Sequence, residues 1–163
     1  MFGGFPEVPP VDGRLRSDGK PINDGRFAEY FVAADLERRH FACTVIDGRE
    51  YDLIAETAEG VILVQVKSTL APTLFEHYRG GRKYKYKKYA FQARGCNGGF
   101  GSYSLVDICA FVALDKEAIV YRKIENVLKG GMMTFFPKQF IEEAKIAVFP
   151  YDTRVDWTDD EGV

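Results

Sequence analysis

One apolar run limits the fold of this chain more than any other stretch. Residues 61–67 read Val-Ile-Leu-Val-Gln-Val-Lys, mostly β-branched and preceded by Gly60, a composition typical of a buried strand. Because side chains alternate along a strand, the run has two faces. One face is apolar and is expected to face a core; it carries Ile62, Val64 and Val66. The other face is partly polar and carries Leu63, Gln65 and Lys67.

A glutamine and a lysine on so apolar a strand need polar partners, because long polar side chains are rarely buried alone. Asp52 lies in the preceding strand, predicted over 51–55, and the short link 56–60 makes the two strands antiparallel neighbours. An acid, an amide oxygen and an ammonium group would then surround a point where a hard cation and a phosphate can bind. The alternative is a strand end in solvent, with Lys67 extended along the surface and Asp52 as a turn residue.

Composition excludes several classes of protein. The 163 residues are enough for one domain with tails. No apolar run approaches the ~20 residues of a membrane span, and the first ten residues do not read as a signal peptide, so we expect a cytoplasmic protein. The three cysteines are scattered, which favours free thiols in a reducing compartment. His40 and His77 are too isolated for a histidine–metal nuclease.

Charge is strongly segregated along the chain. The formal net charge is −2, yet residues 79–94 carry +7 with no acid, so the remainder carries −9. Such asymmetry indicates a polyanion site on an otherwise acidic protein. The basic residues of this segment are the predicted DNA contacts: Arg79, Arg82, Lys83, Lys85, Lys87, Lys88 and Arg94.

Within this segment, lysines alternate with tyrosines. On an extended backbone Lys83, Lys85 and Lys87 face one way, and Tyr84 and Tyr86 face the other. The pattern predicts a ribbon with a charged face and a packed or base-stacking face, suited to nucleic acid. The alternative is an exposed edge strand that its lysines protect from aggregation.

Further elements follow from periodicity and turn residues. A helix from about Asp24 to Arg39 has an apolar stripe of Ala28, Val32 and Leu36, and Glu29 lies on or beside that stripe. The other expected elements are an irregular arm over 1–23, strands over 41–46, 106–114, 118–124 and 146–149, a helix over 137–144, and an acidic tail over 151–163.

The order of a helix with Glu29, a strand with Asp52 and a strand with Gln65–Val66–Lys67 resembles the PD-(D/E)XK nuclease superfamily. Most members carry Asp or Glu where Gln65 stands. The variant with glutamine is similar to group I intron homing endonucleases, and archaeal-type Holliday junction resolvases share the core. Tyr103 and Asp107, before an apolar strand, are similar to the same branch and would be accessory residues.

The resemblance covers about residues 24–124 and implies an α/β fold with a restriction-endonuclease-like core, a mixed central β-sheet flanked by helices. The domain would span 24–150, with a basic aromatic insert over 75–104. A homing-endonuclease-like protein is also expected to be encoded by a phage or mobile element. Since an acid at position 65 is usual, the resemblance implies that Gln65→Glu is tolerated.

The chemistry of these residues suits phosphodiester hydrolysis, which needs charge neutralised on the phosphate and an activated water. Glu29 and Asp52 would hold Mg²⁺, for which Mn²⁺ is expected to substitute, and the Gln65 oxygen and the Val66 carbonyl would add ligands. Lys67 would orient or deprotonate the attacking water. The predicted catalytic set is therefore Glu29, Asp52, Gln65 and Lys67.

These observations favour a metal-dependent DNA endonuclease. One alternative is a DNA-binding module that keeps the fold without cleaving, and another is a structural or assembly protein with an exposed lysine edge. Because one active centre cuts one strand, we expect a homodimer or higher homo-oligomer. The apolar N-terminal arm and the Phe135–Phe136 pair are the predicted contacts.

Overall fold

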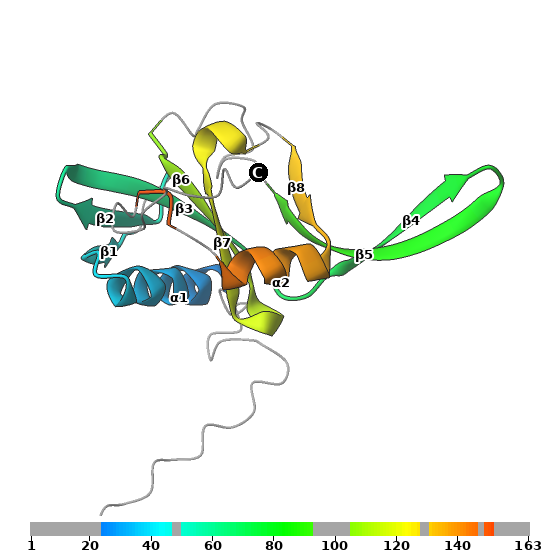
Figure 1. The fold of residues 1–163 in the computed structure, drawn as a ribbon, viewed down its shortest axis with the longest axis horizontal. Coiled ribbons are helices and arrows are strands. Elements are labelled where there is room, and N and C mark those ends of the chain that lie inside the picture. Colours follow the sequence, from blue (N-terminus) through cyan, green and yellow to red (C-terminus); the bar gives the residue numbers. More distant parts are fainter. Residues whose placement is uncertain (1–23, 47–49, 93–104, 128–130, 147–148, 152–163) are drawn as a thin grey trace, which may run out of the picture.

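A five-stranded mixed sheet forms the centre of the protein (Figure 1). The computed structural model describes residues 24–46, 50–92, 105–127, 131–146 and 149–151. In spatial order the strands are β1 (Cys43–Val45), β2 (Leu53–Thr57), β3 (Gly60–Thr69), β6 (Ile108–Ala113) and β7 (Ala118–Lys123). All neighbours are antiparallel except β3 and β6, which are parallel. The predicted mixed central sheet is confirmed.

Helix α1 (Asp24–Arg38) covers one face of this sheet. Its stripe of Ala28, Val32 and Leu36 is fully buried, as the periodicity predicted. The stripe belongs to a first core that includes Leu53 of β2 and Val64 of β3. The alternation predicted for β3 is therefore confirmed on its apolar face.

A second core, rich in aromatic residues, contains the other side of β6. Phe91, Phe111, Phe135 and Phe140 are buried there with ring centroids 5.1–5.9 Å apart. These rings come from β5 (Arg82–Gln92), β6, β8 (Met132–Phe135) and α2 (Pro137–Lys145). The sequence pattern did not predict β8, which pairs with the inner end of β5.

A long hairpin lies between β3 and β6 in the sequence. Strand β4 (Thr73–Arg79) pairs with the outer part of β5, and the two extend away from the body (Figure 1). The tip is the two-residue link Gly80–Gly81, with φ of 57° and 74°. Positive φ at both positions is what a tight hairpin turn requires, and glycine adopts it without steric cost. The predicted extended ribbon is thus one strand of a hairpin.

Several boundaries differ from those predicted. The strand expected over 41–46 is shorter, and the one expected over 51–55 begins and ends two residues later. The last expected strand, over 146–149, is wrong at both ends, because Ile146 and Phe149 lie outside helices and strands. Its middle, 147–148, lies outside the described residues. The predicted arm, the tail after Tyr151, Arg94 and Tyr103 also lie outside them. No helix of the described residues is long and apolar enough to span a membrane.

The predicted intermolecular contact at Phe135–Phe136 is wrong for its first residue. Phe135 is 4% exposed and lies within the second core, because strand pairing with β5 turns its ring inward. Phe136 is 49% exposed.

A polar network fixes α1 to the far edge strand of the sheet. The Tyr121 hydroxyl of β7 donates to Asp35 Oδ2 at 2.7 Å, and Arg39 and Arg38 donate to the same carboxylate at 2.7 and 2.8 Å. Burial alone would raise the pKa of Asp35, but these three hydrogen bonds together hold it below its ordinary value. Burial and the Asp35 charge raise the pKa of Tyr121 well above its ordinary value. The pair is therefore a neutral phenol bonded to a carboxylate.

Replacement of Tyr121 by Phe should lower the free energy of unfolding by about 1 to 3 kcal/mol, the usual contribution of a hydrogen bond to a charged group. Because the pKa of Asp35 is lowered in the folded state, its ionised carboxylate stabilises the fold fully at pH values above the ordinary Asp pKa. That contribution is lost as pH falls through the lowered pKa. Urea unfolding of both proteins should give a constant difference at neutral pH that shrinks in acid. Tyr84→Phe, at an exposed position, is the matched control and should change little.

Candidate active site

Strands β2 and β3 stop pairing through their backbones beside Asp52. Their ladder ends at Leu53 and Val64, and the Asp52 N–H donates to the Val64 carbonyl at 2.9 Å. Two residues further along β3, the N–H of Val66 donates to a side chain instead, to Asp52 Oδ2 at 2.7 Å. The Asp52 side chain therefore lies between the two strands where they separate.

Gln65 is held against this carboxylate. Its Nε2 lies 2.5 Å from Asp52 Oδ2, and its side chain is 4% exposed. Apart from tyrosines and a cysteine, it is the one polar residue that is buried among the described residues. Asp52 is thus the polar partner that the sequence pattern predicts for a glutamine on an apolar strand.

The Asp52 carboxylate is in an unfavourable electrostatic position. Burial raises its pKa, while the Val66 hydrogen bond and the charges of Lys67 and Arg26 act in the opposite direction. The two hydrogen bonds that Gln65 and Val66 donate to this carboxylate both go to Oδ2. A half-buried carboxylate whose pKa is raised by desolvation is a group that a bound cation would stabilise.

Helix α1 contributes a second carboxylate near its N-terminal end. The Glu29 side chain is 16% exposed, at the border of the buried stripe, and its Oε2 lies 3.0 Å from Arg26 Nη1. The same Arg26 charge acts on Asp52. Arg26 therefore links the Glu29 end of α1 electrostatically to the point where β2 and β3 separate.

The donor set constrains which metal site can form here. Within the described ranges, no group of three or more His, Cys, Asp or Glu side chains could hold a metal ion. A site at Asp52 would thus have to use Glu29, the Gln65 amide oxygen, the Val66 carbonyl and water. Such oxygen ligands suit Mg²⁺, which keeps several waters. The Gln65 amide faces Asp52 through nitrogen, so ligation through its oxygen requires rotation of the amide.

Asp107, a predicted accessory residue, bonds the backbone of β3. Its Oδ2 accepts from the Leu63 N–H at 2.8 Å, and its own N–H donates to the Leu63 carbonyl at 2.9 Å. These two bonds fix the start of β6 alongside β3, on the edge away from Asp52. They give Asp107 a role in setting strand register.

Cys109 is a neighbour of the site that sequence reasoning did not single out. It stands opposite Gln65 in the parallel register of β3 and β6 and is 1% exposed. Burial raises its pKa to about 12, with Lys67 lowering and Asp52 raising it. Burial likewise raises the pKa of the free Cys43 to about 11. The raised pKa values favour the protonated form of both thiols at neutral pH. The strand pattern over 106–114 gave no register that would have placed Cys109 here.

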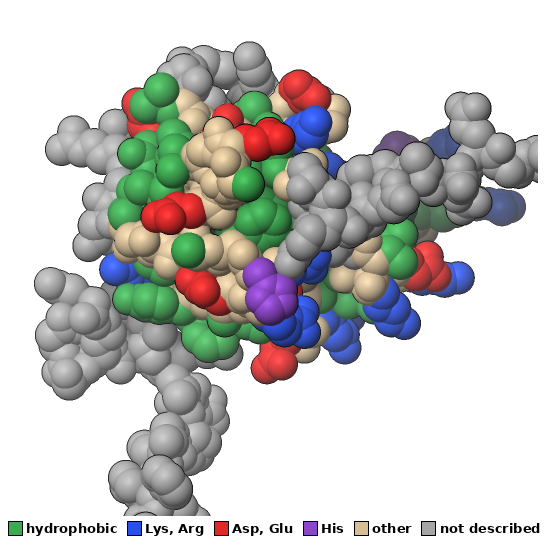
Figure 2. Space-filling model, turned by 60° about the vertical axis from the view of Figure 1, so that its left-hand side comes forward, with side chains coloured by type: hydrophobic (Ala, Val, Ile, Leu, Met, Phe, Trp, Pro, Cys, Tyr) green, Lys and Arg blue, Asp and Glu red, His purple; other side chains and the backbone are tan. Residues whose placement is uncertain are grey.

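The predicted DNA contacts lie mostly on the hairpin. Arg79, Arg82, Lys83, Lys85 and Lys87 are exposed, and Lys88 is half-buried over the Phe136 ring at 4.6 Å. The basic run contains no acid, but the opposite strand supplies Glu76, which pairs with Lys83 at 2.7 Å and with Lys85 at 3.7 Å. In the view of Figure 2, Lys and Arg side chains are more frequent toward the side of the hairpin than on the opposite side.

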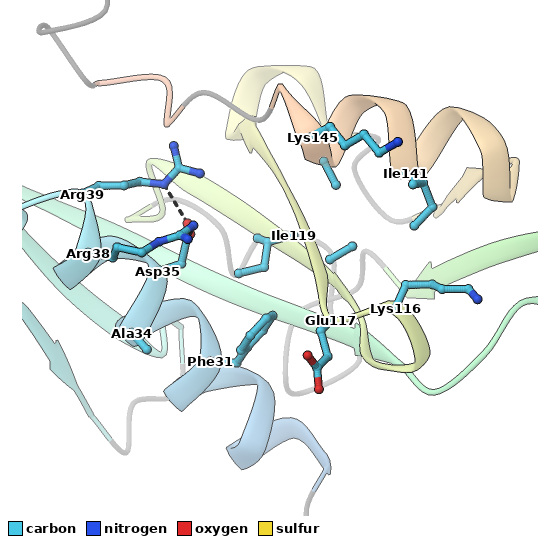
Figure 3. Close-up of a pocket in the computed structure, with 12 residues that line it drawn as sticks. Phe31, Ala34, Asp35, Arg38, Arg39, Lys116, Glu117, Ile119, Ile141 and Lys145 are labelled. Atoms are coloured by element: carbon cyan, nitrogen blue, oxygen red, sulfur yellow. Dashed lines mark hydrogen bonds and ion pairs between the residues drawn. The ribbon is translucent and has the colours of Figure 1, made fainter.

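A pocket of about 520 Å³ lies elsewhere, between α1, the start of β7 and α2 (Figure 3). It contains none of the predicted site residues. Of its two acids, Asp35 and Glu117, the first is engaged by Arg39, as the figure shows, and Phe31 and Ile119 form part of the apolar wall. The pocket therefore carries no arrangement for phosphodiester chemistry.

Replacement of Asp52 by Asn tests its electrostatic position. Because burial raises the folded-state pKa, the ionised carboxylate opposes folding at neutral pH, and this cost disappears as pH falls below the ordinary Asp range. The Asp52→Asn protein keeps a side-chain acceptor for the Val66 N–H without the charge. It should therefore unfold at the same or a higher temperature than the wild type in metal-free buffer at pH 7.

Asp52→Ala is the contrasting variant. It leaves the Val66 N–H without its acceptor and should lose about 1 to 3 kcal/mol of stability. Thermal and urea unfolding would measure both proteins. Equal destabilisation by the two replacements would contradict the view that the charge itself is the unfavourable element.

Comparisons with known proteins were made for the whole chain. No protein-family model matches it, and no curated protein matches it. Among solved structures, it is similar to the bacterial homing endonuclease I-Ssp6803I, with 14% sequence identity, a TM-score of 0.47, and coverage of 69% of this chain and 72% of that one.

Proposed function

We propose that this protein is a metal-dependent endonuclease that hydrolyses phosphodiester bonds in DNA. The observation that carries the proposal is the buried contact of Gln65 with Asp52, at the point where β2 and β3 separate, with the Lys67 charge acting on the same carboxylate. A partly desolvated acid with a raised pKa, next to an amide and a cation, is characteristic of a functional site.

The two carboxylates and the amide would hold the metal. Asp52 would offer Oδ1, Glu29 of α1 would turn from its ion pair with Arg26, and Gln65 would offer its oxygen after rotation of the amide. Bound there, Mg²⁺, or Mn²⁺ in its place, would neutralise charge on the scissile phosphate and lower the pKa of a water molecule. With glutamine in place of an acid, the site carries one negative charge fewer and should bind its metal more weakly.

Lys67 would act on the attacking water and the phosphate. It lies two residues beyond Gln65 on the same face of β3, and its charge acts on both Asp52 and Cys109. From this position its ammonium group can orient the water by hydrogen bonding and stabilise negative charge that develops on the phosphate. The hairpin would bind the DNA backbone through its exposed basic residues.

A second candidate function is DNA binding without cleavage. The observation that favours it is the orientation of Gln65, whose nitrogen satisfies Asp52 Oδ2. A site closed in this way is stable without a cation. Cleavage assays of the purified protein separate the two functions.

Cleavage of both DNA strands would need two active centres, and we propose a homodimer or higher homo-oligomer. Phe136 remains a candidate contact because its ring is exposed, unlike that of Phe135.

Lys67→Ala tests the catalytic role. The variant should lose about 10²-fold or more in the rate of DNA cleavage with Mg²⁺ or Mn²⁺, in line with the usual contribution of a positioned proton-transfer or water-orienting group. Its DNA affinity should stay near that of the wild type, since the hairpin is intact. Nicking of a supercoiled plasmid would measure cleavage, and a mobility-shift assay would measure binding.

Lys116→Ala is the matched control, because Lys116 lies in the loop between β6 and β7, at the pocket of Figure 3. It should cleave at the wild-type rate. A wild-type protein that binds DNA but cleaves none with either metal would establish the non-cleaving module.

Gln65→Glu tests the metal site independently of cleavage. The resemblance to nucleases implies that this replacement is tolerated, but the 2.5 Å contact places a second carboxylate directly against Asp52. Without metal, two carboxylates at this distance in a partly buried site repel each other. The variant should therefore melt below the wild type in EDTA and recover with Mg²⁺ or Mn²⁺, because a ligand that binds only the folded state stabilises it.

Gln65→Leu is the control for loss of the amide without added charge. Its melting temperature should not respond to either metal. If Gln65→Glu showed no metal-dependent recovery, metal binding at this position would be excluded.

A further inference from the structure

The hairpin has two chemically different faces. Opposed residues of an antiparallel pair share a face, and β4 and β5 are in register with Phe75 opposite Tyr86 and Glu76 opposite Lys85. The lysine face carries Leu74, Glu76, Tyr78, Lys83, Lys85 and Lys87. The arginine face carries Thr73, Phe75, His77, Arg79, Arg82, Tyr84, Tyr86 and Lys88.

The polar groups of the lysine face largely satisfy one another. Glu76 bridges Lys83 and Lys85, and Lys83 also lies 5.8 Å from the centre of the Tyr78 ring. Two of its three cations therefore already have an anionic partner within the hairpin.

The arginine face divides into a packed base and an open tip. Near the body, Phe75 stacks on Tyr86 at 6.0 Å, and Lys88 covers Tyr86 and Phe136. Toward the tip, His77 stands opposite Tyr84, and Arg79 stands opposite Arg82. In the part of the chain that the structure describes, no acid lies within ion-pair distance of either arginine.

The two opposed arginines are unfavourable for the hairpin alone. Like charges directly across a strand pair destabilise it, and an isolated two-stranded hairpin is only marginally stable. Arg79 and Arg82 also flank a two-glycine turn that holds them together at the end of the hairpin. A local arrangement that opposes stability is characteristic of a functional site.

We infer that the distal arginine face, formed by His77, Arg79, Arg82 and Tyr84, enters the major groove of DNA and reads base edges. This inference rests on the proposed function and assigns sequence recognition to one face of the hairpin. The lysine face then contributes only general electrostatic attraction to the phosphates.

The dimensions and chemistry suit this role. Seven residues of β4 extend about 23 Å at the usual rise per residue, and the major groove, about 12 Å wide, admits a two-stranded ribbon. Guanidinium groups donate two parallel hydrogen bonds to the O6 and N7 of guanine, the most frequent specific contact in that groove. The residues of the distal arginine face are all exposed, so this surface is open to a ligand.

The test is a selection of DNA ligands by the full-length chain from a pool of duplexes with a randomised central segment, followed by affinity measurements on the selected sequence. Arg79→Lys with Arg82→Lys keeps both charges and removes the two-donor fork. We expect this variant to lose base preference at one or two guanine positions by roughly 10- to 100-fold, with the salt dependence of binding unchanged.

Lys83→Ala with Lys87→Ala is the matched control on the other face. It removes two charges and should flatten the log–log salt dependence by up to about 2, at about 0.9 per phosphate contact, while the selected sequence stays the same. Circular dichroism should show all variants folded, because the substituted positions are exposed.

The outcomes separate this inference from the proposed function. A wild type that binds no DNA would defeat both. A wild type that cleaves or binds DNA but selects no sequence, or an arginine-to-lysine variant that selects the wild-type sequence, would overturn the inference alone. If Tyr84→Ala converted an oligomer into a monomer without changing the selected sequence, the arginine face would be a protein interface and the inference would likewise fail.

Discussion

The hydrogen bonds to Asp52 Oδ2 determine how this site is built. At this carboxylate the backbone ladder of β2 and β3 gives way to side-chain contacts, with Val66 and Gln65 as the two donors. The strands can separate there without leaving the Val66 N–H unsatisfied, which burial would make costly. The same interaction that ends the strand pairing also positions an acid, an amide and, two residues later, a lysine.

That arrangement depends on the sheet being fixed on both faces. On one face α1 buries its stripe against β2 and β3, and Asp35 ties the end of the helix to Tyr121 of β7. On the other face the aromatic core encloses Cys109 next to Gln65. A buried polar contact keeps its geometry only if its surroundings cannot relax around it, and close packing on both sides supplies this condition.

Local pattern was sufficient for the features that depend on neighbours along the chain. Alternation gave the two faces of β3, and helical spacing gave the buried stripe of α1 and the border position of Glu29. Local pattern could not predict strand pairing between residues that are far apart in the sequence. β8 is a short strand without clear alternation, and it is defined by pairing with β5, which lies 40 to 46 positions earlier in the chain. The ion pairs of Glu76 could not be predicted for a similar reason, because Glu76 lies beside the basic run only when β4 pairs with β5.

Strand β5 runs without a break from the aromatic core to the tip of the hairpin. Its inner end is anchored in the aromatic core by Tyr89 and Phe91, which are fully buried, while its outer end carries Arg82 at the tip of the hairpin. The direction of the tip is thus set by core packing rather than by contacts of its own. Two features of opposite sign remain unfavourable within the described chain, Asp52, whose pKa is raised by burial, and the two opposed arginines. In the proposed complex, a cation would offset the first and the polyanion the second, so both would be satisfied only when DNA and metal are bound together.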